Sequence, residues 1–215
     1  MAALGRRGLA GNAAACWLLP TNIMLVRLLF AIAGTALADY SVTLKTDVAV
    51  GSPPGLVVIN VTSAWAPLGA AHLQKLLADQ FYDGAAFFRV VPDFVVQFGI
   101  AGKPAENDKW QTPIEDDPVL HSNLEGTVVY ATAGPNTRTS QLFINLKDNK
   151  HLDASGFAPF ASVVAGMDVV RAIYNPTPGS SGGVSQSDYM SKGDAWIQQH
   201  YPKINFITKS TVGSS

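Results

Sequence analysis

Several groups of residues in this 215-residue chain have types or spacings that could support chemistry by themselves. A run of three acids begins at Glu115 and could bind a metal ion or act as a carboxylate pair, but adjacent acids before a proline are more typical of a solvated loop. Residues 179–183 (GSSGG) match the nucleophile elbow of serine hydrolases, yet prolines stand where that motif requires a strand, which favours a flexible loop. The four histidines lack zinc-site spacing. We therefore expect no metal site and no serine nucleophile.

The elements available to position a site are mostly short strands. Apolar runs rich in β-branched and aromatic residues, bounded by turn residues, predict strands at 40–44, 56–61, 87–91, 94–98, 127–131, 142–145, 157–164 and 204–208. Apolar residues at three- and four-residue steps predict a helix over 68–80, with shorter helices at 166–174 and 188–200. Many short strands with few helices favour an antiparallel sandwich or a closed barrel over a parallel α/β sheet.

Composition excludes several classes of protein. Hydrophobic residues make up 47% of the chain and charged residues 14%, while 19 glycines and 13 prolines are spread along it. This balance predicts one folded domain and excludes a disordered or collagen-like chain. With 15 basic and 16 acidic residues the formal net charge is -1, so the basic surface that a nucleic-acid partner requires is missing.

The first 38 residues differ from the rest, because three arginines precede the first acid, Asp39. The apolar stretch after Arg27 ends in Ala36-Leu37-Ala38, the small-x-small pattern of a cleaved signal. That stretch is well short of the roughly 20 residues that span a bilayer, so a cleaved signal is favoured over a membrane anchor. Translation from Met24 would predict the same mature terminus.

These boundaries predict a signal or targeting peptide at 1–38, a domain at 39–210 and a C-terminal tail at 211–215. We expect the mature protein in the secretory pathway, in the ER lumen or outside the cell, with a periplasm or an organelle lumen as the alternative. Cleavage would remove the only cysteine, Cys16, and with it any thiol nucleophile or disulfide. No stable membrane insertion is expected after cleavage.

Two longer stretches carry a family resemblance. Residues 87–99 (FFRVVPDFVVQFG) resemble the F-x-R-[hydrophobic]2-P-x-F-x-x-Q-x-G signature of cyclophilins, the cyclosporin-binding peptidyl-prolyl isomerases. Residues 131–144 (ATAGPNTRTSQLFI) resemble the A-x-A-G-P-N-T-x-x-S-Q-F-F-I segment of the same family. Two blocks at family spacing are far more specific than one short motif. The resemblance spans about 39–209 and implies a mainly β fold, a closed eight-stranded antiparallel barrel capped by two helices.

The reaction that the resemblance implies is rotation about a peptide bond preceding proline, which breaks no bond and needs no cofactor. It implies Arg89, Gln97 and Phe94 as catalytic residues, with Arg89 hydrogen-bonding the pyramidal proline nitrogen and Gln97 orienting Arg89. The remaining family positions carry over as substrate-binding residues: Val95, Ala131, Thr132, Ala133, Gln141, Phe143, His151, Leu152 and Phe157.

Two positions depart from the family pattern. His151 stands where many members have the tryptophan that contacts cyclosporin, and Phe157 stands near the usual pocket histidine, so only weak cyclosporin binding is expected. The expected partners are proline-containing peptides and unfolded client proteins, and the expected state is a monomer. A non-catalytic chaperone or scaffold module that binds proline segments in the same groove is the alternative. The presence of Arg89 favours the isomerase.

Overall fold

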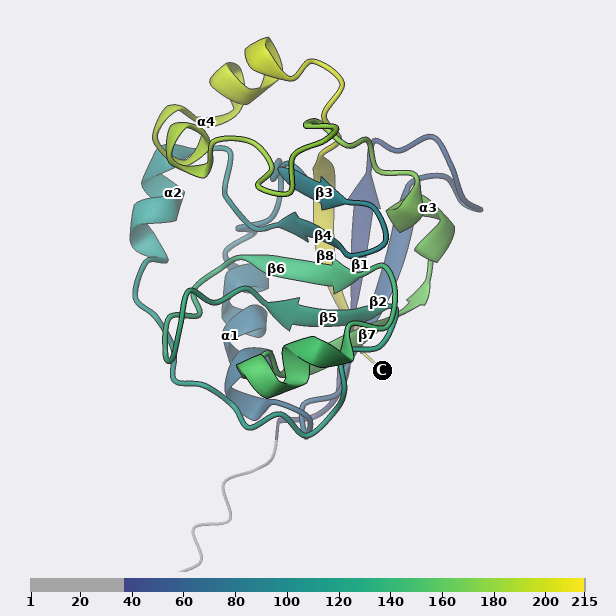
Figure 1. Ribbon diagram of the computed structural model, residues 1–215, viewed down its shortest axis with the longest axis vertical. Coiled ribbons are helices and arrows are strands. Elements are labelled where there is room, and N and C mark those ends of the chain that lie inside the picture. Colours follow the sequence, from purple (N-terminus) through teal and green to yellow (C-terminus); the bar gives the residue numbers. More distant parts are fainter. Residues whose placement is uncertain (1–36, 215) are drawn as a thin grey trace, which may run out of the picture. The chain divides into compact units, whose positions relative to one another are not determined.

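A curled antiparallel sheet of eight strands carries the fold of the computed structural model, which describes residues 37–214 (Figure 1). The elements in chain order are β1 (Tyr40–Thr46), β2 (Leu56–Val61), α1 (Pro67–Ala78), β3 (Arg89–Val91), β4 (Val95–Phe98), α2 (Pro104–Lys109), β5 (Thr127–Tyr130), β6 (Leu142–Asn145), η1 (Lys150–Ser155), β7 (Pro159–Ala165), α3 (Met167–Arg171), α4 (Gln186–His200) and β8 (Ile207–Ser214). All eight predicted strands are present, and the neighbouring pairs β1–β2 and β3–β4 are antiparallel.

The sheet is open, so the expectation of a closed barrel is wrong. The strand order is β3-β4-β6-β5-β7-β2-β1-β8, which leaves β3 and β8 as edges. The chain just before β3 meets the start of β8 at an isolated bridge between Ala86 and Phe206. Backbone hydrogen bonds flank this bridge, from Gly84 N to the Ile207 carbonyl, from Ile207 N to the Ala85 carbonyl and from Phe87 N to the Asn205 carbonyl. Beyond it, the Phe88 carbonyl accepts a hydrogen bond from Val184 N at 3.0 Å. The segment before α4 thus takes the position that a continued ladder between β3 and β8 would need.

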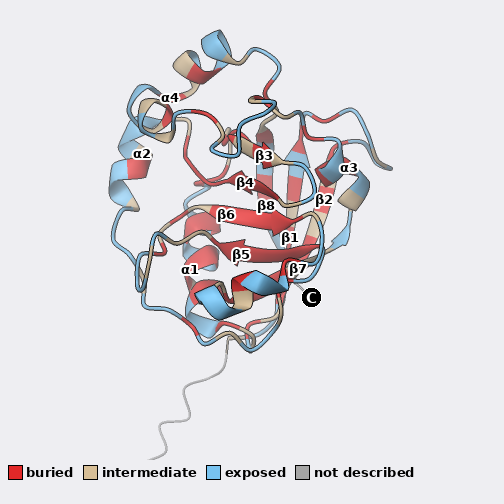
Figure 2. Cartoon of the chain, in the orientation of Figure 1, coloured by how far each residue is buried: buried red, intermediate tan, exposed pale blue. Residues whose placement is uncertain are grey.

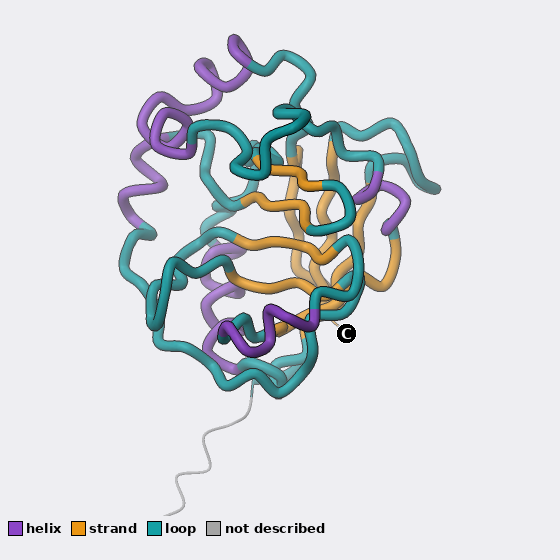
Figure 3. The backbone as a smooth tube through the Cα atoms, in the orientation of Figure 1, coloured by secondary structure: helices purple, strands orange, loops and turns teal. Residues whose placement is uncertain are grey.

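The curled sheet encloses the main core. In Figures 1 and 3, β3, β4, β6 and β5 cross in front of β1, β2 and β8. β1 and β2 alternate buried and more exposed residues, as expected for strands with one face toward a core. All four residues in each of β4, β5 and β6 are buried, and Figure 2 colours these three strands as buried. These three strands are therefore covered on both faces.

Helices cover the rest of the core. α1 begins at Pro67, where the fixed φ of proline suits a first helical position, and it packs against β7 and β8. α3 packs against β2, and α2 packs against α4. The predicted helices at 68–80, 166–174 and 188–200 correspond to α1, a shorter α3 and α4. α2 and η1 were missed because each is six residues long and mostly polar, so neither has the apolar period that reveals a helix. The fold therefore has more helices than the two expected caps.

The C-terminal tail expected at 211–215 is wrong for residues 211–214. These residues belong to β8 and pair with β1, with Tyr40 opposite Ser214 and Val42 opposite Val212. The sequence did not predict a strand here because these residues are mostly polar and lack an apolar pattern. Their pairing with β1 depends on backbone hydrogen bonds. The predicted signal peptide lies outside the described residues, apart from its last two, Leu37 and Ala38. None of the helices within 37–214 has the length and hydrophobicity needed to span a bilayer.

His72 on α1 makes the stability of the fold depend on pH. Its side chain is buried, and Nε2 has no hydrogen-bond partner. Burial lowers the pKa of His72, with the nearby Lys75 and Arg138 acting in the same direction. Protonation therefore favours the unfolded chain, and the stabilising effect of neutral His72 is lost as the pH falls below the unfolded pKa of about 6.5.

We expect the thermal unfolding midpoint of the wild type to fall between about pH 7.5 and pH 5.5, and to fall less in His72→Gln, which cannot titrate there. His200→Gln removes an exposed histidine and serves as the control, since it should keep the wild-type pH dependence. Equal slopes in His72→Gln and the wild type would contradict this assignment.

Candidate active site

The outer face of the sheet brings the predicted site residues together. Strand register places Arg89 opposite Gln97, Gln97 opposite Phe143, and Phe143 opposite Val129. Because residues directly opposite each other in antiparallel strands lie on the same face, these four side chains form one row across β3, β4, β6 and β5. The alternate residues of the same strands, such as Val96 and Ile144, belong to the main core. The period of two thus separates core residues from site residues.

A cavity of about 230 Å³ lies over this row. Its lining residues are Arg89, Phe94, Val95, Gln97, Ala131, Thr132, Phe143, Leu152 and Phe157. A second cavity of about 250 Å³ is formed partly by the same residues, sharing Gln97, Ala131 and Thr132, and adds Ala133, Thr137, Thr139, Gln141 and Gln186. Of the residues predicted from the sequence, only His151 lines neither cavity, and its ring stacks on Phe94 with centroids 6.0 Å apart.

The first cavity has an apolar floor. Val95, Val129, Phe143 and Leu152 form a buried cluster separate from the main core. Phe157 packs on this cluster, and its ring meets Phe143 edge-on at 5.7 Å between centroids. η1 supplies Leu152, so this short helix, missed from the sequence, forms one wall. A small apolar ring such as that of proline fits a surface of this kind, because its burial removes apolar area from water on both sides.

Arg89 lies at the polar edge of this floor and is held at two nitrogens. Its Nε donates to the Ser181 carbonyl at 2.6 Å, and its Nη1 donates to Gln97 Oε1 at 3.0 Å. Its Cζ lies 5.7 Å from the centroid of the Phe94 ring. Burial lowers the pKa of Arg89, but a guanidinium stays protonated in proteins. Since it carries five N–H donors, the two bonds leave donors for a substrate.

A chain of amides extends from Arg89 across both cavities. Gln97 Nε2 donates to Gln141 Oε1 at 2.7 Å, and Gln141 Nε2 donates to Gln186 Oε1 at 3.0 Å. The sequence predicted Gln97 and Gln141, but it gave no reason to include Gln186 or the Ser181 carbonyl. Ser181 lies in the segment between α3 and α4, and Gln186 is the first residue of α4. The glycines of that segment indicate a turn and reveal nothing about which carbonyl faces the site.

The acidic run that begins at Glu115 has a structural role, and Asp117 corrects the expectation of a solvated loop. Asp117 is buried and accepts from the backbone N–H groups of Leu68 at 3.0 Å and Gly69 at 2.8 Å, in the first turn of α1. It also pairs with Arg138 at 3.0 Å. These contacts supply the first-turn donors of α1, which has no side-chain N-cap, with acceptors.

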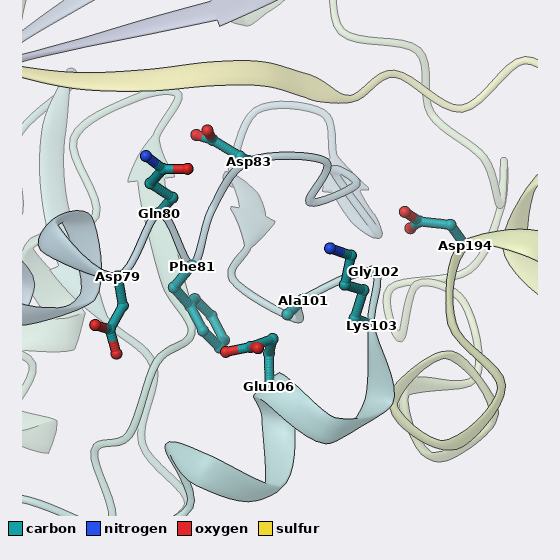
Figure 4. Close-up of a pocket in the computed structure, with 9 residues that line it drawn as sticks. All are labelled: Asp79, Gln80, Phe81, Asp83, Ala101, Gly102, Lys103, Glu106 and Asp194. Atoms are coloured by element: carbon teal, nitrogen blue, oxygen red, sulfur yellow. The ribbon is translucent and has the colours of Figure 1, made fainter.

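A third hollow of about 180 Å³ lies elsewhere and is shown in Figure 4. Its carboxylates are largely engaged, because Asp79 pairs with Lys109 at 2.5 Å and Asp83 with Lys209 at 2.7 Å. Asp194 accepts from the Tyr189 hydroxyl at 3.3 Å, and burial raises its pKa. Within the described part of the chain, no three His, Cys, Asp or Glu side chains are arranged to hold a metal ion.

Comparison with known proteins gives the fold first. The structure of a cyclophilin type peptidyl-prolyl cis-trans isomerase from Cryptosporidium parvum matches with a TM-score of 0.61 and 17% identity, covering 83% of this chain and 99% of the other. The two therefore share a mainly β fold.

The sequence profile of the family described as "Cyclophilin type peptidyl-prolyl cis-trans isomerase/CLD" matches residues 43–194. A peptidyl-prolyl cis-trans isomerase of Acinetobacter baylyi is 35% identical over 162 residues, covering 73% of this chain and 82% of the relative. Human peptidyl-prolyl cis-trans isomerase-like 3 is 33% identical over 134 residues, covering 60% and 79%. The chain belongs to the cyclophilin-type peptidyl-prolyl cis-trans isomerase family, as its two sequence blocks predicted.

Gly183 lets the segment before α4 approach Arg89. Its φ is +76°, and a Cβ there would lie 2.6 Å from Arg89 Cβ and 2.7 Å from the Phe88 carbonyl oxygen. We expect Gly183→Ala to displace Arg89 and lower kcat/KM in a proline-peptide isomerisation assay by about tenfold to a hundredfold, because misplacement of about 1 Å can cost that much.

Gly179→Ala is the matched control. Gly179 lies in the same segment with φ +84°, but a Cβ there meets no atom within 4 Å. It therefore adds the same kind of backbone strain without the clash, and its kcat/KM should stay close to that of the wild type. A similar loss in both variants would mean that backbone strain, and not the approach to Arg89, is responsible.

Proposed function

We propose that this chain accelerates cis–trans isomerisation of Xaa-Pro peptide bonds, with Arg89 as the catalytic residue. The observation that carries the proposal is a protonated guanidinium with unused donors, fixed at two nitrogens beside a buried apolar floor. Such a site combines a strong hydrogen-bond donor with a surface that takes the proline ring.

The chemistry needs only this combination. Amide resonance gives the peptide bond a rotation barrier of about 18–20 kcal/mol. As the bond twists, the proline nitrogen loses conjugation and becomes a better hydrogen-bond acceptor than it is in the planar amide. A donor placed at this nitrogen therefore binds the transition state more strongly than the ground state, which is the condition for faster turnover. No bond is broken, so no nucleophile or redox cofactor takes part.

The other site residues bind the substrate on either side of this bond. Phe94, Phe143 and Leu152 would contact the proline ring and exclude water, which strengthens the electrostatic interaction with Arg89. Gln97 would orient both Arg89 and the substrate carbonyl. Residues 131–133 would bind the segment before the proline along the second cavity. Proline-containing peptides are thus the substrate class.

We also propose that its substrates are unfolded client proteins and that it acts after export. The support for export is the sequence of residues 1–38, in which a basic start and an apolar stretch precede the Ala36-Leu37-Ala38 pattern.

Arg89→Ala tests the catalytic role. We expect kcat/KM to fall by about a hundredfold to a thousandfold, the usual cost of removing one transition-state donor. Arg89→Lys should restore little, because the single nitrogen of an ammonium group cannot reproduce the planar fork in which Nε reaches the Ser181 carbonyl and Nη1 reaches Gln97. Arg171→Ala is the control, since that exposed arginine pairs with Glu125 outside the site.

Turnover is measured on the chain starting at Asp39, with circular dichroism to confirm the fold of each variant. Wild-type turnover in Arg89→Ala would remove Arg89 from the mechanism. A folded wild type that binds proline peptides without turnover would make the groove a binding module.

We propose that cyclosporin binds weakly because His151 is exposed and offers a small ring at this side of the groove. His151→Trp should strengthen cyclosporin inhibition by about fivefold, since a larger aromatic surface contributes on the order of 1 kcal/mol to such contacts. His200→Trp places the same residue at an exposed position of α4 and should leave cyclosporin inhibition unchanged. Equal inhibition of His151→Trp and the wild type would assign weak binding to another position.

A further inference from the structure

We propose that Gln186 is a positioning residue, whose amide oxygen fixes the orientation of Gln141, Gln97 and finally Arg89. The inference rests on the proposed function, because it concerns how the catalytic guanidinium is held. It assigns a role in the reaction to the first residue of α4, which lies far along the chain from both sequence blocks of the family.

The hydrogen bonds between these side chains all run in one direction. Arg89 can only donate, so Gln97 must present its carbonyl oxygen to Nη1, at 3.0 Å. The Gln97 NH2 group then faces Gln141 and requires an oxygen there, which it meets at 2.7 Å. The Gln141 NH2 group in turn requires an acceptor, and Gln186 Oε1 supplies it at 3.0 Å. Each amide therefore has one orientation that satisfies both of its neighbours.

Removing the last acceptor would weaken this selection, because the orientations of Gln97 and Gln141 would then be set from the Arg89 end alone. A glutamine amide has nearly the same shape in its two flipped orientations, so hydrogen-bond partners decide between them. If Gln141 turned its NH2 group toward Gln97, two donors would face each other, and Gln97 would be driven to turn as well. Its NH2 group would then face the guanidinium, again donor against donor. The oxygen at position 186 thus favours the one arrangement in which Gln97 accepts from Arg89.

Gln186 is well placed for this role because α4 is firmly anchored. Tyr189, one turn further on, is fully buried, and its hydroxyl accepts from Ala86 N at 3.0 Å. Asp194 N donates to the Gly102 carbonyl at 2.9 Å, and the turn before α4 is tied to Phe88 through Val184 N. The helix is interrupted at Gly193, whose backbone is not helical, so its first half is the part that holds Gln186. That half cannot shift without breaking contacts in a separate apolar cluster that includes Phe88 and Tyr189.

The same segment holds Arg89 from its other side. The Ser181 carbonyl accepts from Nε, while Gln186 acts on Nη1 through two intervening amides. Residues 181–186 thus determine both ends of the guanidinium, and rotation of the group about its own bonds is opposed at each end. The fixed donors can then meet the twisted amide without first reorganising, which is how a preorganised site lowers a barrier.

Two substitutions at this position separate the oxygen from the rest of the side chain. Gln186→Leu keeps similar volume but removes the acceptor. Gln186→Glu keeps an acceptor oxygen at the same position of a side chain of equal length. We expect Gln186→Leu to lower kcat by about three- to tenfold, the usual effect of one hydrogen bond, with KM for a short proline peptide little changed. Gln186→Glu should retain most of the wild-type kcat. Gln199→Leu, at an exposed position of the same helix, is the matched control and should behave as the wild type.

A double-mutant cycle tests whether Gln186 acts through Gln141. In a Gln141→Leu background, Gln186→Leu should have no further effect on kcat, because the chain of amides is already broken. Additive losses would overturn the inference, as would wild-type kcat in Gln186→Leu or equal losses in Gln186→Leu and Gln186→Glu. Wild type and Arg89→Ala are assayed beside them. A wild type without turnover, or turnover that survives Arg89→Ala, would refute the proposed function, whereas the outcomes named above refute only the role of Gln186.

Discussion

Burial of three short strands on both faces is the constraint on which this structure depends. β4, β5 and β6 place one set of residues in the main core and the alternate set on the outer face, where Val95, Val129 and Phe143 are apolar. An exposed apolar face would be costly, so η1 and the segment before α4 must cover its margins while leaving the groove between them. The groove is thus the part of the outer face that the protein leaves for a ligand to cover.

The polar margin of the groove follows from the same constraint. A guanidinium beside an apolar floor loses water, and each lost hydration contact must be replaced by a protein acceptor. The Ser181 carbonyl and Gln97 do this for Arg89, and Gln97 then needs partners of its own. A row of amides results, because a glutamine whose oxygen accepts a hydrogen bond has an NH2 group that needs an acceptor on the next residue. The same hydrogen bonds therefore orient the Arg89 guanidinium and replace the water contacts that it loses.

Much of this arrangement could be predicted from the sequence. Apolar and β-branched runs indicate the strands, and residues 87–99 and 131–144 match the cyclophilin motifs in residue type and spacing. The row from Arg89 to Phe143 follows from strand register and could be anticipated. Closure of the barrel could not, since it depends on which partner takes the Phe88 carbonyl. Gln186 and Ser181 could not be predicted either, because a long-range contact made by one side chain or by a backbone carbonyl leaves no local pattern in the sequence. The buried Asp117 was misjudged because its partner, Arg138, is 21 residues away in sequence.

The distance in sequence between Arg89 and the Ser181 carbonyl has a consequence for the order in which contacts form during synthesis. Arg89 and the Ser181 carbonyl that holds it are separated by 92 positions, and α4 lies further on still. Contacts this distant in sequence form late, because the loop between them must close against its entropy. A nascent chain ending before position 181 can contain β3 through β7 and the apolar groove, yet it has no partner for Nε. On this order of contacts, the apolar groove forms first, and Arg89 is fully held only when the residues from Ser181 onward have emerged and docked.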